Sequence, residues 1–342
     1  MKSPAFCRLL LVSACFVVAA VRAEPIQHDF IAVDEGLSDL MRVNEKEPKE
    51  NWLVHIGKPH PRDLQLVGGG RLLVSHEQGY SEYDIATGKL LKDLSLYHDV
   101  SSVRRFPNGH TLIVGVDFDL PKKNKGDNPL GDPAGRHVIF AEFDASDHLL
   151  NRITYVGDYA RLVRETAQGT YLCGSNTMFR EGDGKGNWIR EIPVAGFTHA
   201  WKAVRLPNGD TLMSSGYGTS KENGSAFMAE VDANGKIVRK FGSAADVPAG
   251  VHPYFYATFQ LLPNGDVVVA NWQGHGIGHN DSGVQILEFD PKGAIVWEWS
   301  DRAFVSSMQA VLVLDGLNTA LLHDERNGLM EPLPDAEAPP KG

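Results

Sequence analysis

The sequence predicts an all-β protein, a six-bladed β-propeller closed into a ring, and three observations lead to this prediction. A hairpin of two short apolar strands around a glycine turn recurs at intervals of about 40 to 60 residues, which suits four-strand blades. A second hairpin, in which polar and apolar residues alternate, follows most copies of the first. The two ends of the chain carry complementary halves of one further blade.

Residues 1–23 have the features of a signal peptide. Lys2 and Arg8 precede an apolar run at residues 9–21, and small residues at 21–23 suit cleavage. The run is short for a membrane span, so a membrane anchor is the weaker alternative, and lipid attachment at Cys15 stays open. We therefore expect a secreted or periplasmic protein, with one propeller domain at residues 24–335 and a tail at 336–342.

Strand patterns at the two ends predict how the ring closes. Residues 39–43 and 51–56 form two outer strands without inner ones, whereas residues 304–314 and 318–323 form two inner strands without outer ones. Pairing the two halves completes the last blade and removes the exposed edge that an open repeat would leave.

The inner hairpin is clearest at residues 199–213, HAWKAVRLPNGDTLM. Asn-Gly between apolar runs is a strong hairpin signal, and we expect both turn residues to have positive φ. Copies that begin with histidine lie at 60–74, 98–114, 199–213 and 252–269, and copies without it lie at 161–173 and 304–322.

The outer hairpins resemble those of known propellers. The turn YDIATGK at residues 83–89, and FDPKG at 289–293 followed by Trp297 and Trp299, resemble the blade turns of pyrroloquinoline-quinone-like repeat proteins and secreted arylsulfotransferase-type propellers. The resemblance implies the fold, but these turns belong to the scaffold and carry little functional information. Quinone dehydrogenases of this kind have a vicinal disulfide over the cofactor. The mature chain has only Cys173, so this resemblance does not imply quinone chemistry.

The charge of the chain limits its partners. The formal net charge is −10, and no basic stripe is present, which argues against nucleic acids and anionic membranes as partners. We expect an extracellular small molecule or glycan as the partner, no membrane insertion after signal cleavage, and a monomer.

Histidines repeat at two equivalent places in the predicted blades. His60, His98, His199 and His252 enter innermost strands, and His76, His275 and His323 leave second strands. Because these two loops of a propeller blade emerge on the same face, the histidines are expected near one mouth of the central channel. A lone loop histidine is usually a capping or solvated residue, but the repeated placement favours a shared site.

These residues suggest a divalent metal site in which imidazoles leave coordination positions open for catalysis. Without a metal, clustered histidines could act as general acid and base. Arg161 could hold an anion or form a surface ion pair, and aromatic residues near the mouth could stack on sugar rings or pack the blades. The predicted metal ligands are His60, His76, His199, His252 and His323; the predicted catalytic residues are His98, His199, His252 and Arg161; and the predicted substrate-binding residues are Asn176, Trp201, Tyr254, Asn271 and Trp272.

Two long loops are expected to overhang the same mouth, at residues 117–136 and 273–283. Calcium binding in the first loop is a weaker hypothesis, because its spacing does not match an EF-hand. That hypothesis rests on Asp117, Asp119, Asp127 and Asp132.

The sequence leaves two classes of function open. The first is a secreted enzyme with a histidine-lined, metal-dependent site, acting on an extracellular carbohydrate by lyase or hydrolase chemistry. Arylsulfotransferase-like sulfuryl transfer is the enzymatic alternative. The second class is a non-catalytic propeller that binds a ligand or a protein partner. An enzyme should concentrate polar residues at the channel mouth, whereas a protein-binding module should show apolar patches on a rim.

Overall fold

A computed structural model describes residues 24–121, 135–157, 159–176, 178–193, 196, 199–216, 226–275, 278 and 282–334. Several sequence predictions fall outside these residues: the signal peptide at 1–23, most of the loop at 117–136 including Asp127 and Asp132, part of the loop at 273–283, and the tail at 336–342.

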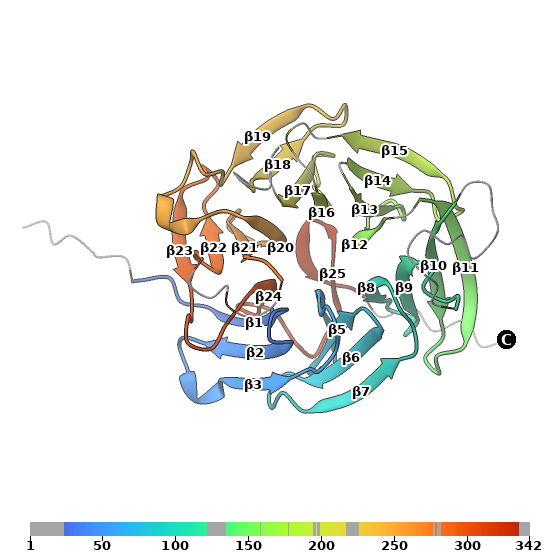
Figure 1. The fold of residues 1–342 in the computed structure, drawn as a ribbon, viewed down its shortest axis with the longest axis horizontal. Coiled ribbons are helices and arrows are strands. Elements are labelled where there is room, and N and C mark those ends of the chain that lie inside the picture. The colour runs from blue at the N-terminus through green and yellow to red at the C-terminus, as the bar shows by residue number, and fades with distance from the viewer. Residues whose placement is uncertain are drawn as a thin grey trace, which may run out of the picture.

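The prediction of an all-β protein is confirmed. The described residues form 26 β-strands and two short 3-10 helices, η1 (Pro48–Glu50) and η2 (Ala249–Val251). Neither helix could cross a membrane, and no other helix occurs in the described part of the chain. Figure 1 shows the sheets arranged radially around a centre, as in a propeller.

Four separate sheets have four antiparallel strands each. Two of them use consecutive strands near the N-terminus, one follows in the middle of the chain, and one combines both ends of the chain. The first two are β4 (Asp63–Gly68), β5 (Arg71–His76), β6 (Gly79–Asp84) and β7 (Leu90–Ser95), then β8 (Val100–Arg105), β9 (Thr111–Val116), β10 (His137–Phe143) and β11 (Leu149–Val156). The third is β12 (Arg161–Glu165), β13 (Tyr171–Ser175), β14 (Met178–Gly182) and β15 (Trp188–Pro193).

The fifth sheet has ten strands, so the sheets do not by themselves confirm the predicted count of six blades. It contains two four-stranded runs joined where Gly216 pairs with Phe255. A Cβ on Gly216 would lie 1.8 Å from Phe255 Cδ2, so only glycine allows this contact. The runs are β16 (His199–Arg205), β17 (Thr211–Gly216), β18 (Met228–Val231) and β19 (Ile237–Phe241), and β20 (Phe255–Leu261), β21 (Val267–Trp272), β22 (Ile286–Phe289) and β23 (Ile295–Trp299).

The two chain ends meet in one sheet, but the division of strands differs from the prediction. The order is β24-β1-β2-β3, so the N-terminal segment supplies three strands and the C-terminal segment one. The sequence did not predict β1, whose last five residues are all buried. The strands are β1 (Asp29–Asp34), β2 (Asp39–Asn44), β3 (Trp52–His55) and β24 (Met308–Val313).

The predicted inner strand at 318–323 does not pair in the closing sheet. The chain there instead leads into a hairpin of β25 (His323–Asn327) and β26 (Leu329–Pro332). Figure 1 shows β25 at the centre of the ring. The hairpin joins the ten-stranded sheet through the pair Leu261 and Leu329, which accounts for its last two strands.

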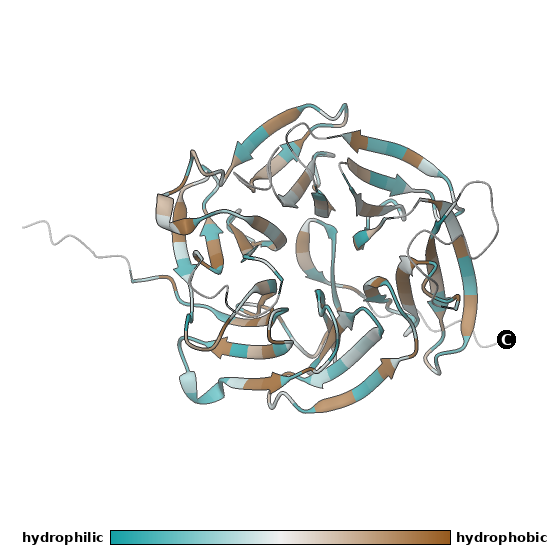
Figure 2. Ribbon diagram, viewed as in Figure 1, coloured by the Kyte–Doolittle hydropathy of each residue, from teal (hydrophilic) through white to brown (hydrophobic). Residues whose placement is uncertain are grey.

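Burial changes from the inner to the outer strands. The β9, β17, β21 and β24 strands are buried along their whole length, whereas β3 and β15 alternate between more and less exposed residues. Figure 2 shows this alternation of hydrophilic and hydrophobic residues on the outer strands. A continuous apolar run fits a strand covered on both faces, and alternation fits a strand with one face in water.

The turns confirm the hairpin positions and correct their expected geometry. Gly209 has φ 89° and Gly265 has φ 90°, but Asn208 and Asn264 are not among the residues with positive φ. The Gly209 amide donates to the Leu206 carbonyl, and the Leu206 amide donates to the Asp210 carbonyl. This is a type I turn followed by a glycine bulge, which needs positive φ at only one residue.

Candidate functional site

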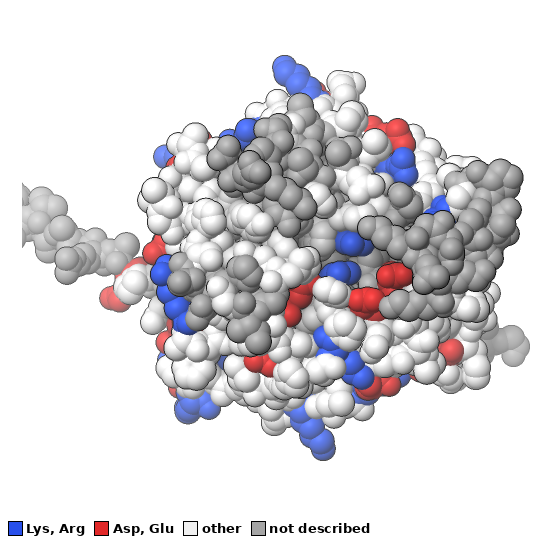
Figure 3. Space-filling model, viewed as in Figure 1, with Lys and Arg blue, Asp and Glu red and all other residues white. Residues whose placement is uncertain are grey.

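A pocket of about 260 Å³ opens where the innermost strands begin. Residues at or just before the starts of β4, β12, β16 and β20 line it, as expected when the loops that enter inner strands share one face. Figure 3 shows acidic and basic side chains next to each other around a hollow at the centre of the view. The lining residues are Glu35, Arg62, Tyr159, Arg161, His199, Trp201, Phe255, Trp272, His275 and Gln309.

β-Bulges help to direct these side chains. The pairing of β12 with β13 shifts register between Arg161 and Arg164, and the pairing of β16 with β17 shifts between Ala200 and Ala203. A bulge leaves an extra residue unpaired and turns its side chain away from the regular alternation. Trp201 lies within such an irregularity and Arg161 borders one, and strand periodicity predicts neither.

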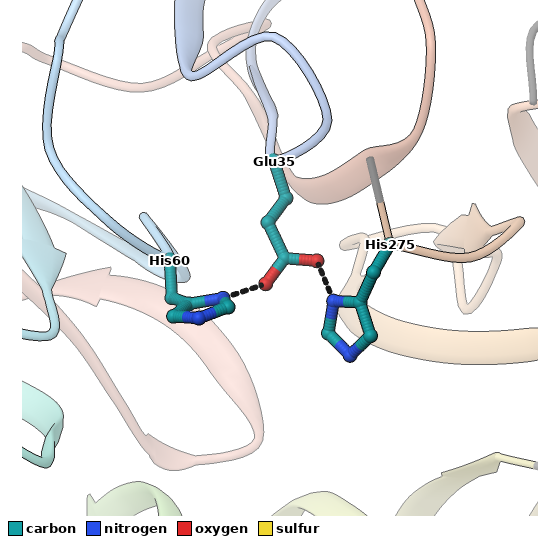
Figure 4. A group of neighbouring side chains, drawn as sticks. All are labelled: Glu35, His60 and His275. Carbon is teal, nitrogen blue, oxygen red and sulfur yellow. Dashed lines mark hydrogen bonds and ion pairs between the residues drawn. The ribbon is translucent and has the colours of Figure 1, made fainter. Parts of the chain in front are cut away.

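Glu35, His60 and His275 form a compact group at the pocket. His60 Nδ1 lies 2.8 Å from Glu35 Oε1, and His275 Nδ1 lies 3.2 Å from Glu35 Oε2. Figure 4 shows the carboxylate between the two imidazoles. Within the described part of the chain this is the one group of three or more such side chains that could hold a metal ion, with ligand atoms within 4.8 Å of one another.

The Glu35 carboxylate is kept ionised in a buried position. Burial raises its pKa, but hydrogen bonds with His275 and His60 and the charge of Arg62 outweigh burial and hold the pKa well below its usual range. The indole Nε1 of Trp272 donates a further hydrogen bond to Glu35 Oε2, at 2.7 Å. Both carboxylate oxygens are thus bound by neighbouring rings.

The turn that carries Glu35 is held by the preceding residue. Asp34 Oδ1 accepts hydrogen bonds from the amides of Gly36 and Leu37, and Asp34 also accepts from the amides of Ser306 and Ser307. These bonds tie the β1–β2 turn to the segment before β24, so closure of the ring also fixes Glu35.

Two arginines give the pocket positive charge. Burial and the nearby charge of Arg161 lower the pKa of Arg62 to about 10. The guanidinium of Arg161 lies 4.2 Å from the centre of the Tyr159 ring and 5.1 Å from that of Trp201. Stacking on two aromatic rings restricts the orientation of this cation.

Aromatic rings form a wall beside these charges. Trp201 and Trp272 each contact Phe255 edge to face, with centroids 4.9 and 5.3 Å apart. Tyr254 stacks on Trp272 at 6.0 Å. The pocket therefore combines a rigid apolar surface with cations and a histidine-bound carboxylate.

The residues proposed from the sequence are divided between the pocket and its surroundings. Arg161, His199, Trp201 and Trp272 line the pocket, and His60 joins through Glu35. Tyr254 packs behind Trp272. None of the other predicted site residues is a lining residue of this pocket.

Three of the remaining histidines have partners away from the pocket group. His98 Nε2 lies 2.6 Å from the Leu120 carbonyl oxygen, and His252 Nδ1 lies 2.5 Å from that of Ser282. The buried His323 Nδ1 lies 3.0 Å from the carbonyl oxygen of Leu321. Loop conformation separates these rings, because residues at equivalent strand positions can still turn to local carbonyl groups.

The last three predicted residues differ in burial. His76 is buried, and its Nε2 lies 3.3 Å from Ser81 Oγ. Burial lowers the pKa of His76 to about 4. Asn271 is buried, and its Nδ2 donates to three backbone carbonyls, those of Val251, His252 and Val284. Asn176 is exposed, with φ 51°.

Several lining residues were absent from the predicted site. Arg62 could have been predicted from the sequence. It directly precedes the innermost strand β4, and Arg161 has nearly the same position in its own blade, at the start of the innermost strand β12. Glu35 gave no signal, since its strand was not predicted and its partners are distant in the chain. Tyr159 and Gln309 have no distinguishing pattern in the sequence.

Comparison with known proteins supports the fold. No family model and no curated protein matches the chain. A protein of unknown function from Bacteroides caccae superposes with a TM-score of 0.63 at 18% identity, over 84% of this chain and 98% of that one. That similarity supports a shared propeller-like fold and does not extend to function.

More distant structures are also similar in outline. An inactive variant of virginiamycin B lyase from Staphylococcus aureus, solved with quinupristin, has a TM-score of 0.47 at 8% identity, over 80% of this chain and 84% of that one. Regucalcin from Agrobacterium tumefaciens, described as a calcium-binding protein, has a TM-score of 0.45 at 11% identity, over 72% of this chain and 83% of that one. Similarity at this level carries no argument about the site.

Proposed function

We propose that the protein is an enzyme that acts on a carbohydrate in this pocket, by lyase or hydrolase chemistry, with a divalent metal ion held by Glu35, His60 and His275. One observation carries the proposal: a group able to bind a metal, two arginines and an aromatic wall share one cavity. Ligand sites of enzymes are typically such concave pockets, with few polar groups on an apolar wall.

The side chains of the group fit a transition-metal ion. Two imidazoles and one ionised carboxylate suit Mn²⁺, Zn²⁺ or Fe²⁺, and three protein ligands leave positions open for substrate or water. A divalent ion there would supply Lewis-acid polarisation of a substrate oxygen. The low pKa of Glu35 keeps its carboxylate in the form that a metal requires.

The other lining residues have roles that do not depend on the metal. Trp201 and Trp272 can stack on the faces of a sugar ring, and Arg161 can orient an acidic group. His199 lines the same cavity and can accept or return a proton. A lyase needs a base that removes a proton from carbon, and a hydrolase needs an acid that protonates the leaving group.

A metal-free mechanism is the second candidate, and the hydrogen bonds in Figure 4 favour it. A carboxylate between two imidazoles, with Nδ1–oxygen distances of 2.8 and 3.2 Å, fixes the orientations of both rings. The two rings would then act as general acid and base.

The finer points of the fold and location belong to the same proposal. We propose that the ring works as six blades, because the two runs of the ten-stranded sheet are joined by the single pair Gly216 and Phe255. We also propose that the protein is secreted or periplasmic, supported by the charge and apolar pattern of residues 1–23, and that it is a monomer.

Metal content tests the proposal directly. Untagged protein, purified without chelators and analysed for elements, should contain about one divalent ion per chain. Glu35→Gln and His275→Ala should lose this ion, and His148→Ala should keep it, because His148 is an exposed residue paired with Asp144. Equal metal content in all four proteins would refute the proposed ligands.

Activity should be measured on the same proteins. Oligosaccharides that contain acidic sugars are the first substrates to test, because the pocket is cationic. A lyase forms an unsaturated product that absorbs in the ultraviolet, whereas a hydrolase releases only a new reducing end. Turnover that survives chelation but falls in His275→Ala would favour the metal-free mechanism. Binding without turnover would indicate the non-catalytic alternative, and activity only on aryl sulfates would indicate sulfuryl transfer.

A further inference from the structure

Three donor groups at the pocket have no hydrogen-bond partner among the described residues. They are the Nε atoms of Arg62 and Arg161 and the Nε1 of Trp201, and all three side chains line the cavity. Each of the three atoms is buried. A buried donor without an acceptor reduces stability, so native proteins keep few of them, and those at a pocket point to a missing ligand.

The two arginines also lack an ion-pair partner. Among the described residues no carboxylate comes within ion-pair distance of Arg62 or Arg161, whereas Arg164 on the same strand as Arg161 pairs with Asp63 and Glu325. Arg62 and Arg161 line the same cavity, so two guanidinium groups of like charge share one space. An anion bound between the guanidinium groups would form ion pairs with both.

The acidic side chain that lines the pocket, Glu35, is already bound to other residues. The oxygens of Glu35 face His60, His275 and the indole of Trp272. Stacking of Arg161 on Tyr159 and Trp201 holds its guanidinium at the aromatic wall. An anion therefore has donors available beside the surface on which a sugar ring would stack.

We infer that Arg62, Arg161 and Trp201 form a carboxylate subsite, and that the substrates of this pocket are acidic sugars in which the carboxylate is attached to the ring. The planar forks of two arginines match a carboxylate, and the indole N–H adds a third donor. The pocket, of about 260 Å³, suits a single ring rather than a long chain segment. The inference deepens the proposed function, but binding at this subsite does not require the metal.

Calorimetry on the full chain with chelator present tests the subsite. D-glucuronate should bind, and D-glucose, which differs at the carboxylate, should bind at least about ten-fold more weakly. Arg161→Gln and Arg62→Gln should each weaken glucuronate binding by roughly ten- to a hundred-fold, the effect of losing one charge-assisted hydrogen bond. Arg180→Gln is the matched control, because Arg180 pairs with Glu191 at the surface and should not affect binding.

Thermal stability separates a ligand-binding role from a structural one. Arg62→Met should unfold at the same temperature as the parent protein or higher, since it removes an unpaired buried charge, and it should abolish the stabilisation by glucuronate. A lower melting temperature together with unchanged glucuronate binding would overturn the inference and assign Arg62 to the fold.

The outcomes distinguish this inference from the proposed function. His275→Ala should lose metal but still bind glucuronate under chelation. Equal affinity for glucuronate and glucose would overturn the carboxylate subsite even if the protein binds metal. Tighter binding of glucose 6-sulfate than of glucuronate would also overturn it, in favour of a sulfate subsite. Selective glucuronate binding by a protein without metal or turnover would retain the subsite and reject the proposed enzyme.

Discussion

His28 shows how a single side chain can connect distant parts of the ring. Its Nε2 lies 2.8 Å from Glu288 Oε2 on β22, and its Nδ1 lies 2.7 Å from Asp315 Oδ2 after β24. The ring is buried and meets Trp297 edge to face. Burial lowers the pKa of His28, but Asp315 and Glu288 outweigh burial and raise the pKa to about 9.

Stability is therefore expected to depend on pH through His28. Because the folded pKa is about 9 and the unfolded pKa about 6.5, the stabilisation is complete below pH 6.5 and is lost as pH rises through about 9. The loss should reach up to about 3 kcal/mol, from 1.36 kcal/mol per pKa unit. Urea unfolding at pH 6 and pH 9.5 measures it. In His28→Gln the free energy of unfolding should change less between these two pH values. An equal change in parent and variant would contradict the role of His28.

The β25–β26 hairpin is the element that stabilises the centre of the ring. Glu325 Oε2 accepts from Arg164 Nε at 2.6 Å, and Glu325 Oε1 accepts from Lys202 Nζ at 2.7 Å. The neighbouring Asp324 pairs with Arg104. These cations come from β8, β12 and β16, and all five side chains are buried. The hairpin thus neutralises charges that three inner strands direct to the axis.

Removing one carboxylate from the hairpin should destabilise the fold strongly. Glu325→Gln leaves Lys202 without its ion-pair partner and Arg164 with Asp63 alone, and the cost of breaking a buried pair is about 3–5 kcal/mol. Chemical denaturation measures the loss, and Glu298→Gln on the exposed side of β23 is the control. The double variant Lys202→Met, Glu325→Met should recover part of the stability. Equal stability of Glu325→Gln and the parent would show that the hairpin does not neutralise these charges.

The whole molecule depends on pairing between its two ends. β1 pairs with β24 from Phe30 to Asp34, and the side chains of β1 and β2 pack on those of the β4–β7 sheet in one core. Without the N-terminal strands, β24 would have a bare edge and this core would be open. Closure of the ring thus completes the hydrophobic core, and it also positions Glu35 in the site.

Deletion of residues 24–56 should prevent cooperative folding of the whole chain. Calorimetry should show no sharp unfolding transition for this variant. A point substitution gives a finer test: Val33→Asp, at a fully buried position of β1, should reproduce much of the effect, and Leu53→Asp, at a half-exposed position of β3, should not. A deletion variant that melts like the parent protein would contradict closure by these strands.

Much of the fold could be predicted because strand periodicity and turn chemistry are local. Alternation in the outer strands, apolar inner strands and positive φ at Gly209 and Gly265 depend on neighbours close in sequence. Prediction was less accurate where a strand had no repeated pattern. β1 was not predicted as a strand, and the segment before β25 was predicted as an ordinary inner strand, so the roles of β1 and β25 in the ring were not predicted.

By itself the sequence determined an all-β ring of repeats, the face on which polar loops meet, and the candidates Arg161, His199, Trp201 and Trp272, because equivalent positions of repeated blades converge by symmetry. Only the tertiary structure decided which of these side chains share a pocket. Glu35, His60 and His275 come from three distant turns, and their contacts depend on loop conformation and ring closure. The partners that bind His98, His252 and His323 are carbonyl oxygens, which every residue carries, so no sequence pattern could have separated these histidines from the pocket.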